Sequence, residues 1–578
     1  MECHHTNMRA VAIGESVVAG AISAVIGSDL ALRDIRVLGH RALDAVYFAV
    51  RDAAWRTIAS SIEEFDGVQT ESGFEYKFLL HHRSPSTDLL TRGKVIGRRD
   101  CIEVEVMVKS SRNQLLNRVG LSVLHPIELR GNVVTVMTDA GHTTATFPER
   151  IAPHQPFQDV RGLTQNIENG IDLAITFQGG VFETEDHRNW TDAGWKTYSP
   201  PLADPAPQRW TDGQTARQAI ILRPQLKSGA AQTAPKPVKV TISDRQTGHF
   251  PRIGLSAPGS ESLSAEERAL VASIAPHFLS VELSDGPTAQ RRLQHAAAEA
   301  RSLQIPLHVL LALPESRLDF WAGELRDAAN IIDTVTVVDI DTHVSSPRLV
   351  EGMRDGLDTS SMQVGGGTRG YFAELNRASD HLGPADYLQY SISAEVHHTD
   401  ARSIFDTLLA QRDTLDDALR IAKGLPVHVG PVTLSERLSL HTGSQGEYAP
   451  YSSEFSSDPR TAEQFAAAWV VGAVSSLARA DALTFFGTSG PGGIIAGGQD
   501  RITPAGEILS EIMSRRGQAL LAVDVNEPRR VSALAYRGQD GNVHVIAANH
   551  ESSTTPVAVI VAGVERHVVL PPYGVLID

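Results

Sequence analysis

The stretch from residue 252 to residue 313 decides the fold. It alternates short apolar runs with longer helical segments: RIGLSAP (252–258), AEERALVASIA (265–275), HFLSVEL (277–283), AQRRLQHAAAEARSL (289–303) and PLHVLLAL (306–313). Apolar runs bounded by turn residues are typical of strands buried on both faces, and the segments between them carry alanine and leucine at helical spacing. This order predicts parallel strands joined by helices.

The same alternation continues along the chain. Five more apolar strands are predicted at 334–340, 369–376, 387–398, 426–434 and 482–488. Eight strand–helix units in this length are typical of a (β/α)8 barrel, so we expect a TIM-like catalytic barrel at residues 250–515. The segment 435–461, rich in Ser, Tyr and Gly, follows the seventh strand and is expected to form a lid.

The regions on either side of the barrel have strand composition. Before it, β-branched and aromatic residues fill VYFAVRD (46–52), FEYKFLLHH (74–82), CIEVEVMVKS (101–110), VVTVMT (133–138) and AIILRP (219–224). Such short strands predict an N-terminal β-sandwich at residues 1–240, which the linker-like KSGAAQTAPKP (227–237) ends. Residues 516–578 predict a small C-terminal β-sandwich domain. The expected fold class is therefore multidomain, α/β plus β.

Charge and composition exclude several classes of partner. The chain of 578 residues has 52 basic and 68 acidic side chains, a net charge of 52 − 68 = −16, which opposes binding to nucleic acid or anionic lipid. Two cysteines cannot build a disulfide framework, and no apolar run reaches the ~18–20 residues of a membrane span. We expect a soluble, cytoplasmic protein with no nucleic-acid or membrane partner, compatible with a homo-oligomer.

Polar residues at the ends of the predicted barrel strands are the candidates for catalysis, because barrel enzymes place their chemistry there. They are Glu282 in the second strand, Asp339 and Asp341 in the fourth, Glu374, Asn376 and Arg377 in the fifth, and Glu395, His397, His398 and Asp400 in the sixth. Residues two apart share one face of a strand, so Glu374 with Asn376, and Glu395 with His397, are expected to point together into the barrel mouth. Rim ion pairs, helix caps and structural histidines are the alternative interpretations.

A second polar cluster lies in the N-terminal region, at FETEDHRNWTD (182–192). Its Glu185, Asp186, Asn189 and Asp192 could reach over the barrel and bind hydroxyl groups. The alternative is a solvated loop with aromatic anchors. No cofactor and no metal are expected: GGGTRG (365–370) fits GxGxxG, but it precedes a predicted strand instead of joining a strand to a helix.

At these residues the chain resembles the D-apionate lactonase family. The resemblance is carried by AGAISAVIGSDLALRDIRVLG (19–39), AVRDAAWRTI (49–58), FETEDHRNWTDAGWKTYSPPL (182–202), YFAELNR (371–377) and EVHHTD (395–400). It implies an N-terminal β domain, a (β/α)8 barrel, a C-terminal β domain and a bacterial enzyme of apiose catabolism. AEVHHTD (394–400) departs from the family's Pro-Gln-Val-His-Ala-Phe-Asp and adds a charge, so a relative with another sugar substrate stays open.

Opening a sugar-acid lactone requires a base for water, a donor for the oxyanion and an acid for the ring oxygen. From residue type and predicted position we expect Glu374 as base and His397 as acid, with Arg377 or Asn376 facing the carbonyl oxygen and Glu282 or Glu395 as alternate carboxylates. The remaining candidates are expected to bind the substrate: Glu185, Asp186, Asn189, Asp192, His398 and Asp400. The alternatives are a glycoside hydrolase that uses two barrel carboxylates and a carbohydrate-binding protein without catalysis.

Overall fold

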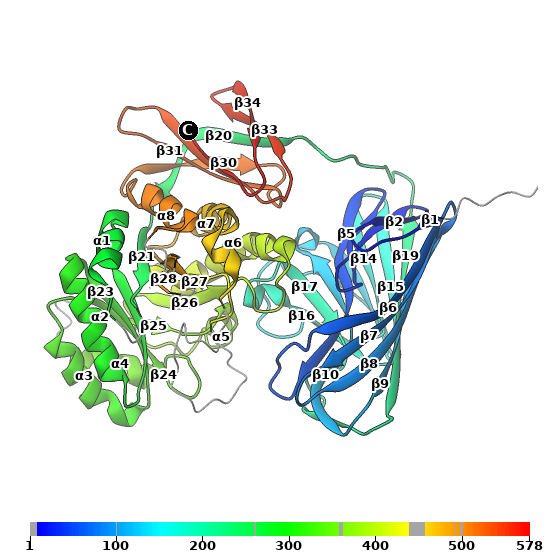
Figure 1. Ribbon diagram of the computed structural model, residues 1–578, viewed down its shortest axis with the longest axis horizontal. Coiled ribbons are helices and arrows are strands. Elements are labelled where there is room, and N and C mark those ends of the chain that lie inside the picture. The colour runs from blue at the N-terminus through cyan, green and yellow to red at the C-terminus, as the bar shows by residue number, and fades with distance from the viewer. Residues whose placement is uncertain are drawn as a thin grey trace, which may run out of the picture. The chain divides into compact units, whose positions relative to one another are not determined.

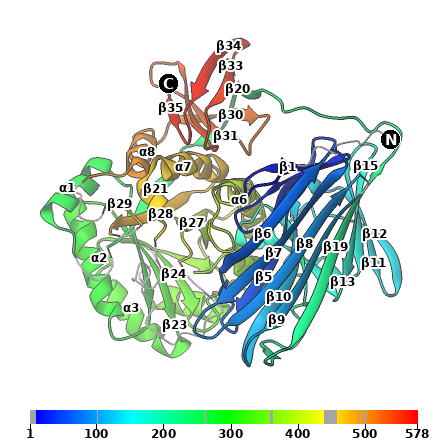
Figure 2. The ribbon, with the colours of Figure 1, turned by 45° about the vertical axis from the view of Figure 1, so that its right-hand side comes forward.

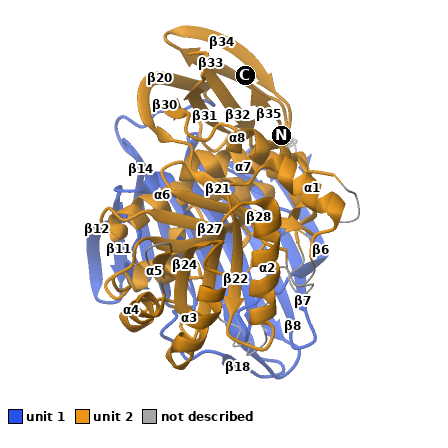
Figure 3. Cartoon of the chain, turned by 90° about the vertical axis from the view of Figure 1, so that its left-hand side faces the viewer, with its two compact units in different colours: residues 1–187, 194–235 blue, residues 188–193, 236–578 orange. Residues whose placement is uncertain are grey.

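The computed structural model describes residues 9–99, 101–258, 262–357, 362–437, 457–490, 492–496 and 501–578. The chain divides into two compact units, shown in different colours in Figure 3. Unit 1 runs to His187 and resumes at Gly194–Pro235, while unit 2 comprises Arg188–Ala193 and Lys236–Asp578. The short segment Arg188–Ala193 thus interrupts unit 1 in sequence but belongs to the barrel unit.

Unit 1 consists of two antiparallel sheets, whose long strands run side by side in Figure 2. The first sheet has the order β1 (Arg9–Ala10), β6 (Ser60–Thr70), β7 (Gly73–Arg83), β8 (Asp88–Arg98), β9 (Cys101–Ser110), β19 (Thr215–Leu226), β15 (Ile171–Gln178), β14 (Gly162–Glu168), β11 (Val133–Thr138) and β12 (Gly141–Thr146). The second has the order β13 (Phe157–Val160), β16 (Phe182–Asp186), β17 (Gly194–Tyr198), β10 (Gln114–Pro126), β5 (His40–Asp52), β4 (Leu32–Val37), β3 (Ile22–Ile26) and β2 (Ser16–Ala19), and β18 (Gln208–Trp210) also pairs with β10.

The two sheets share one hydrophobic core, as a sandwich requires. In β7 the alternate residues Phe74, Tyr76, Phe78 and Leu80 are buried in this core, while the residues between them are more exposed. Trp195 is also buried here, with its ring centroid 4.9 Å from that of Phe147. The prediction of an N-terminal sandwich is confirmed.

Unit 2 contains a closed barrel of eight parallel strands, with helices outside the strands (Figure 1). The strands are β21 (Arg252–Ser256), β22 (Leu279–Ser284), β23 (Leu307–Leu313), β24 (Ile332–Asp339), β25 (Gln363–Gly367), β26 (Leu388–Ser393), β27 (Val427–Thr433) and β28 (Ala482–Ser489); β21 pairs with β28 to close the barrel, and β29 (Gly493–Ile495) adds beside β28. The helices are α1 (Ala265–Ile274), α2 (Ala289–Leu303), α3 (Leu318–Asp327), α4 (Pro347–Gly356), α5 (Phe372–Arg377), α6 (Ala401–Ala422), α7 (Gln464–Leu477) and α8 (Pro504–Met513). The predicted (β/α)8 barrel is confirmed. Of the predicted lid, residues 438–456 lie outside the described part of the chain.

The fifth strand was predicted in the wrong place. It is β25, which contains Gly365–Gly367, and the predicted segment 369–376 forms the short helix α5 instead. Because glycine has low strand propensity, this segment carries no strand signal in the sequence. Close packing nevertheless requires glycine here, since a Cβ on Gly365 would lie 2.3 Å from the Tyr387 ring. The expectation that this glycine motif precedes a strand is therefore also wrong.

The sixth strand is shorter than predicted. β26 ends at Ser393, so Glu395, His397 and His398 lie in the turn that follows, before α6. The expectation that Glu395 and His397 share one strand face is wrong for this reason. Both still lie at the carboxyl end of the barrel, where βα connections form the active sites of barrel enzymes.

The C-terminal β region is one seven-stranded sheet of unit 2. Its order is β34 (Val564–Leu570), β33 (Thr555–Val561), β20 (Val238–His249), β30 (Ala519–Val525), β31 (Val531–Arg537), β32 (Val543–Asn549) and β35 (Val575–Ile577). β20 precedes the barrel in sequence yet pairs with β30 and β33. The sheet packs on α6 and α7: Phe405 stacks on His550 with ring centroids 4.7 Å apart, and Ser475 Oγ donates to Ala533 O at 2.9 Å. No described helix combines the length and apolarity needed to cross a membrane.

Candidate active site

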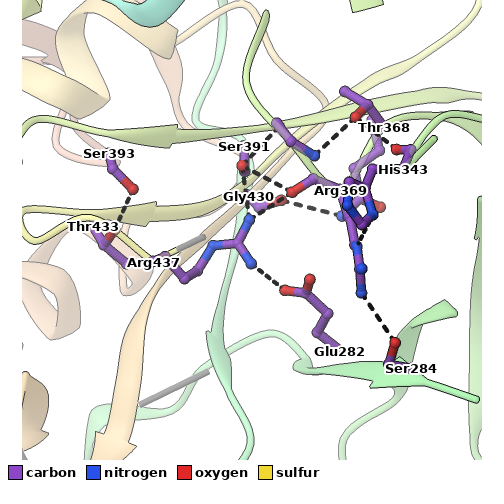
Figure 4. A network of polar contacts seen from close by, with 12 residues as sticks. Glu282, Ser284, His343, Thr368, Arg369, Ser391, Ser393, Gly430, Thr433 and Arg437 are labelled. Atoms are coloured by element: carbon purple, nitrogen blue, oxygen red, sulfur yellow. Dashed lines mark hydrogen bonds and ion pairs between the residues drawn. The ribbon is translucent and has the colours of Figure 1, made fainter. Parts of the chain in front are cut away.

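A buried ionic network fills the carboxyl end of the barrel (Figure 4). Glu282, in β22, forms an ion pair with Arg437, which follows β27, and both side chains are buried. Arg437 Nη2 also donates to Ser391 Oγ of β26 at 2.8 Å and to the carbonyl oxygen of Arg369 at 2.6 Å. Arg437 therefore ties together the carboxyl ends of strands two, six and seven.

A second buried arginine extends this network to the fourth strand. Arg369 Nε donates to His343 Nδ1 at 2.8 Å, and its Nη1 donates to Ser284 Oγ at 3.3 Å (Figure 4). His343 lies in the connection between β24 and α4 and is half-buried. Burial lowers the pKa of His343 to about 4; the positive charge of Arg369 adds to this shift and the negative charge of Asp339 opposes it. The imidazole is therefore neutral at physiological pH.

Helix α5 carries the predicted base, Glu374. Its carboxylate accepts a hydrogen bond from the backbone N of Tyr371 at 2.9 Å, as the third residue of a capping box does. Burial raises the pKa of Glu374 to about 7, although the charge of Arg377 acts to lower it. Burial likewise raises the pKa of Tyr371, whose phenol is hydrogen-bonded to Ser393 and feels the charges of Glu436, Arg437 and Glu374. Glu374 thus has both a structural role and a pKa suited to proton transfer.

The segment Arg188–Ala193, the end of the predicted acidic loop, lies against these barrel elements. Arg188 Nη1 donates to Asp413 Oδ2 of α6 at 2.8 Å, and Asn376 Nδ2 of α5 donates to Asn189 Oδ1 at 3.1 Å. Thr191 Oγ1 lies 3.4 Å from the carbonyl oxygen of Ser393, the last residue of β26. The fifth and sixth βα connections therefore share this segment as a neighbour.

A short polar contact joins Asp192 to His397. Asp192 Oδ2 lies 2.6 Å from His397 Nδ1, and the two side chains are 12% and 17% exposed. Trp190 lies edge-on to the imidazole with ring centroids 5.9 Å apart, and the Arg377 guanidinium lies 5.2 Å from the Trp190 ring centroid. A carboxylate on Nδ1 fixes the ring orientation and leaves Nε2 as the atom through which a proton can move.

Glu395 belongs to a separate acid pair. Arg460 Nη2 donates to Glu395 Oε1 at 3.0 Å, and Arg460 Nε donates to Asp458 Oδ2 at 2.8 Å. Burial and the neighbouring Asp458 carboxylate raise the pKa of Glu395 to about 8, against the effect of Arg460. Burial acts to raise the pKa of Asp458 as well, yet hydrogen bonds from Arg460 and Glu395 lower it to about 2. At neutral pH the pair therefore holds one proton.

The other predicted substrate-binding residues are placed as follows. Asp400 caps helix α6, accepting from Ser403 N at 3.0 Å and from Ser403 Oγ at 2.7 Å, whereas His398 is half-buried in the turn before it. Glu185 and Asp186 are buried in β16 of unit 1. Glu185 lies 3.3 Å from His187 Nε2, and Asp186 accepts from Ala152 N at 3.0 Å. Both carboxylates therefore already have internal partners.

Sequence reasoning missed four residues of the buried network and its neighbours: Arg437, Arg369, His343 and Tyr371. The rule that selected Asp339 and Asp341 at the end of the fourth strand applies equally to His343, two residues further on. Arg369 and Tyr371 fall within the predicted strand 369–376, and Arg437 falls within the predicted lid 435–461. Asp192 was predicted to bind substrate, whereas the structure pairs it with His397. No local pattern in the sequence links Asp192 to a histidine 205 residues away.

Comparison with known proteins identifies two family domains. Residues 4–227 match the D-apionate lactonase N-terminal domain, and residues 253–517 match the D-apionate lactonase TIM barrel domain. A D-apionate lactonase of Brucella anthropi is 28% identical over 512 residues, which cover 83% of each chain. Among solved structures, a GH51 arabinofuranosidase from Xanthomonas axonopodis pv. citri is 11% identical with a TM-score of 0.41, covering 57% of this chain and 88% of its own.

A GH30 endoxylanase from Clostridium papyrosolvens C71 is similar to the same degree, with 10% identity and a TM-score of 0.39, covering 59% of this chain and 98% of its own. These two likenesses are too distant to say anything about chemistry. The two family domains, by contrast, together span both units and the whole candidate site, from the Asp192 segment to Arg437. The chain therefore belongs to the D-apionate lactonase family.

Proposed function

We propose that this protein hydrolyses a sugar-acid lactone of the D-apionolactone type to the open aldonate. The family and the Brucella anthropi relative support this class of reaction. The observation that carries the proposal is the 2.6 Å contact between Asp192 and His397, beside the helix that holds Glu374. A carboxylate-oriented imidazole after the sixth strand and a carboxyl group with a raised pKa after the fifth strand supply the base and the acid that ester hydrolysis requires.

His397 is our candidate for the general base. With Nδ1 held by Asp192, Nε2 accepts a proton from water as the water oxygen attacks the acyl carbon of the lactone. The carbonyl then becomes a tetrahedral oxyanion. Asp192 stabilises the imidazolium that forms, because a carboxylate 2.6 Å from Nδ1 favours the charged ring. Asp192 is thus assigned to positioning His397 instead of binding a sugar hydroxyl.

Glu374 is our candidate for the general acid, which exchanges the roles expected from the sequence. With a pKa of about 7 the carboxyl holds its proton for a substantial fraction of the time at neutral pH. When the ring C–O bond breaks, Glu374 donates this proton to the departing alkoxide oxygen. The new carboxylic acid ionises to the aldonate, and the proton taken up by His397 returns to Glu374 through solvent.

The two buried arginines match the charge that this reaction creates. Arg369 and Arg437 place two buried positive charges at the carboxyl end of the barrel, where Arg437 also pairs with Glu282. Negative charge develops on the acyl oxygen and remains on the product, so the positive charges of the two arginines stabilise both. Arg377, exposed and stacked over Trp190, is our candidate for contact with the substrate's hydroxyl groups.

The test is an assay of the purified protein against a panel of aldonolactones and aryl glycosides, with and without a chelator. We expect proton release from lactones only, detected with a pH indicator, and first-order opening well above the rate without enzyme. Release of chromophore from aryl glycosides, with no lactone opening, would replace this proposal by a glycosidase. Loss of lactone opening with chelator, restored by one divalent cation, would add a metal ion to the proposed mechanism.

A further inference from the structure

The buried ionic network includes two half-buried residues, Ser284 and His343, which lie at the carboxyl ends of the second and fourth barrel strands. Glu282, Arg437 and Arg369 are 6%, 3% and 4% exposed, whereas His343, to which Arg369 Nε donates, is half-buried. His343 follows the fourth strand at its carboxyl end, the end of the barrel at which barrel enzymes bind their substrates. The proposed steps of base, acid and charge stabilisation leave this residue without a role.

The backbone of His343 is held in an unfavourable conformation. Its φ is +63°, in the left-handed region that only a few per cent of non-glycine residues adopt, although histidine is among the residues enriched there. Four backbone-directed contacts hold it there: His343 N donates to Asp339 O at 2.8 Å, His343 O accepts from Thr368 Oγ1 at 2.8 Å and from Arg369 N at 3.2 Å, and Val344 forms a β-bridge with Thr368. Strain that the surroundings maintain in this way is typical of functional sites.

The hydrogen bond from Arg369 also fixes the tautomer of the ring. A guanidinium Nε–H can only donate, so His343 Nδ1 must be the unprotonated, accepting nitrogen. In a neutral imidazole the proton then resides on Nε2. Because burial and the charge of Arg369 lower the pKa of His343 to about 4, the ring stays neutral across the physiological range. Among the described residues, no hydrogen bond partner of His343 Nε2 is present.

We infer that His343 is a catalytic residue that donates a hydrogen bond from Nε2 to the acyl oxygen of the bound lactone, with Arg369 as its positioning residue. This inference rests on the proposed function and extends it. A neutral imidazole donor does not lose its proton to the oxyanion and needs no reorganisation as charge develops, since Arg369 already holds it in place. The bond strengthens as the carbonyl oxygen becomes an oxyanion, so its contribution appears in the rate of the chemical step.

The decisive comparison is between H343N and H343Q. Asparagine tolerates the left-handed backbone and keeps a polar group near Nδ1, but it has no donor at the position of Nε2. Glutamine is long enough to place an N–H there. We expect H343N to lower kcat by about 100- to 1000-fold with KM changed by less than about fivefold, the effect of removing one oxyanion donor. H343Q should recover part of the loss, and H381N, an exposed histidine before β26, should behave as wild type.

A readout independent of activity is the tautomer itself. In protein labelled with 15N-histidine, the resonances missing from H343N belong to His343, and they should show a protonated Nε2 and an unprotonated Nδ1 at pH 7. The inference would be overturned by near-normal kcat in H343N, by a rise in KM alone, or by a proton on Nδ1. As long as the wild-type protein opens lactones, none of these results affects the proposed function. If wild type opens no lactone, the proposed function fails first and this inference fails with it.

Discussion

Replacing Asp192 by Asn tests whether the contact with His397 drives the chemistry. The substitution keeps the shape of the side chain but removes the negative charge 2.6 Å from Nδ1. A hydrogen bond to a charged group contributes about 1.5–3 kcal/mol, and each 1.36 kcal/mol is a factor of ten in rate. If the bond acts mainly on the imidazolium formed in the transition state, kcat/KM should fall by roughly 10- to 150-fold, or further if the amide stabilises the wrong tautomer.

The barrel offers a matched control at its opposite end. Asp333, at the start of β24, lies 3.4 Å from His308 Nε2 of β23, so D333N breaks an aspartate–histidine pair of the same kind. The amino ends of barrel strands serve stability and not catalysis. We expect D333N to lower the urea midpoint and leave kcat/KM within about twofold of wild type. D192N should lower kcat/KM and leave the urea midpoint close to that of wild type. Equal activity of D192N and wild type, at matched folded fraction, would refute the assignment of His397.

Three further predictions concern the other charged groups. E374Q should lower kcat by about 100- to 10,000-fold, as expected for loss of a general acid. In wild type we expect kcat to fall above pH 7 because Glu374 ionises there, and E374Q should abolish this fall. A pH profile of kcat, measured in a pH-stat, that is the same in E374Q and wild type would contradict this. E282A leaves the Arg437 charge buried without its carboxylate, so the free energy of unfolding should drop by about 3–5 kcal/mol, whereas an unchanged urea midpoint would show that solvent already reaches Arg437. Burial lowers the pKa of both His308 and His428 below 6.5, so below pH 6.5 the unfolded chain binds more protons than the folded chain. The stability that these two histidines contribute above pH 6.5 is therefore lost as the pH falls below 6.5. The urea midpoint should be lower at pH 5.5 than at pH 7.5, and equal midpoints would contradict this prediction.

The pattern of apolar segments predicted most of the fold. Seven of the eight barrel strands lie where short apolar runs alternate with helical segments, because a strand buried on both faces leaves that local signal. The fifth strand was missed because its glycines carry no such signal. Gly365 is required by the residue that precedes β26, Tyr387, whose ring occupies the space of a Cβ at Gly365.

What the sequence by itself determined is the barrel architecture with its flanking β regions, the family, and a set of polar residues at the carboxyl ends of strands. Only the tertiary structure decided which of these residues are partners. Asp192 and His397 are 205 residues apart, and Glu282 and Arg437 are 155 apart, so neither pair follows from local spacing. Helical and strand periods arise from interactions within a few residues, whereas a hydrogen bond between distant side chains depends on how the closed barrel brings its connections together.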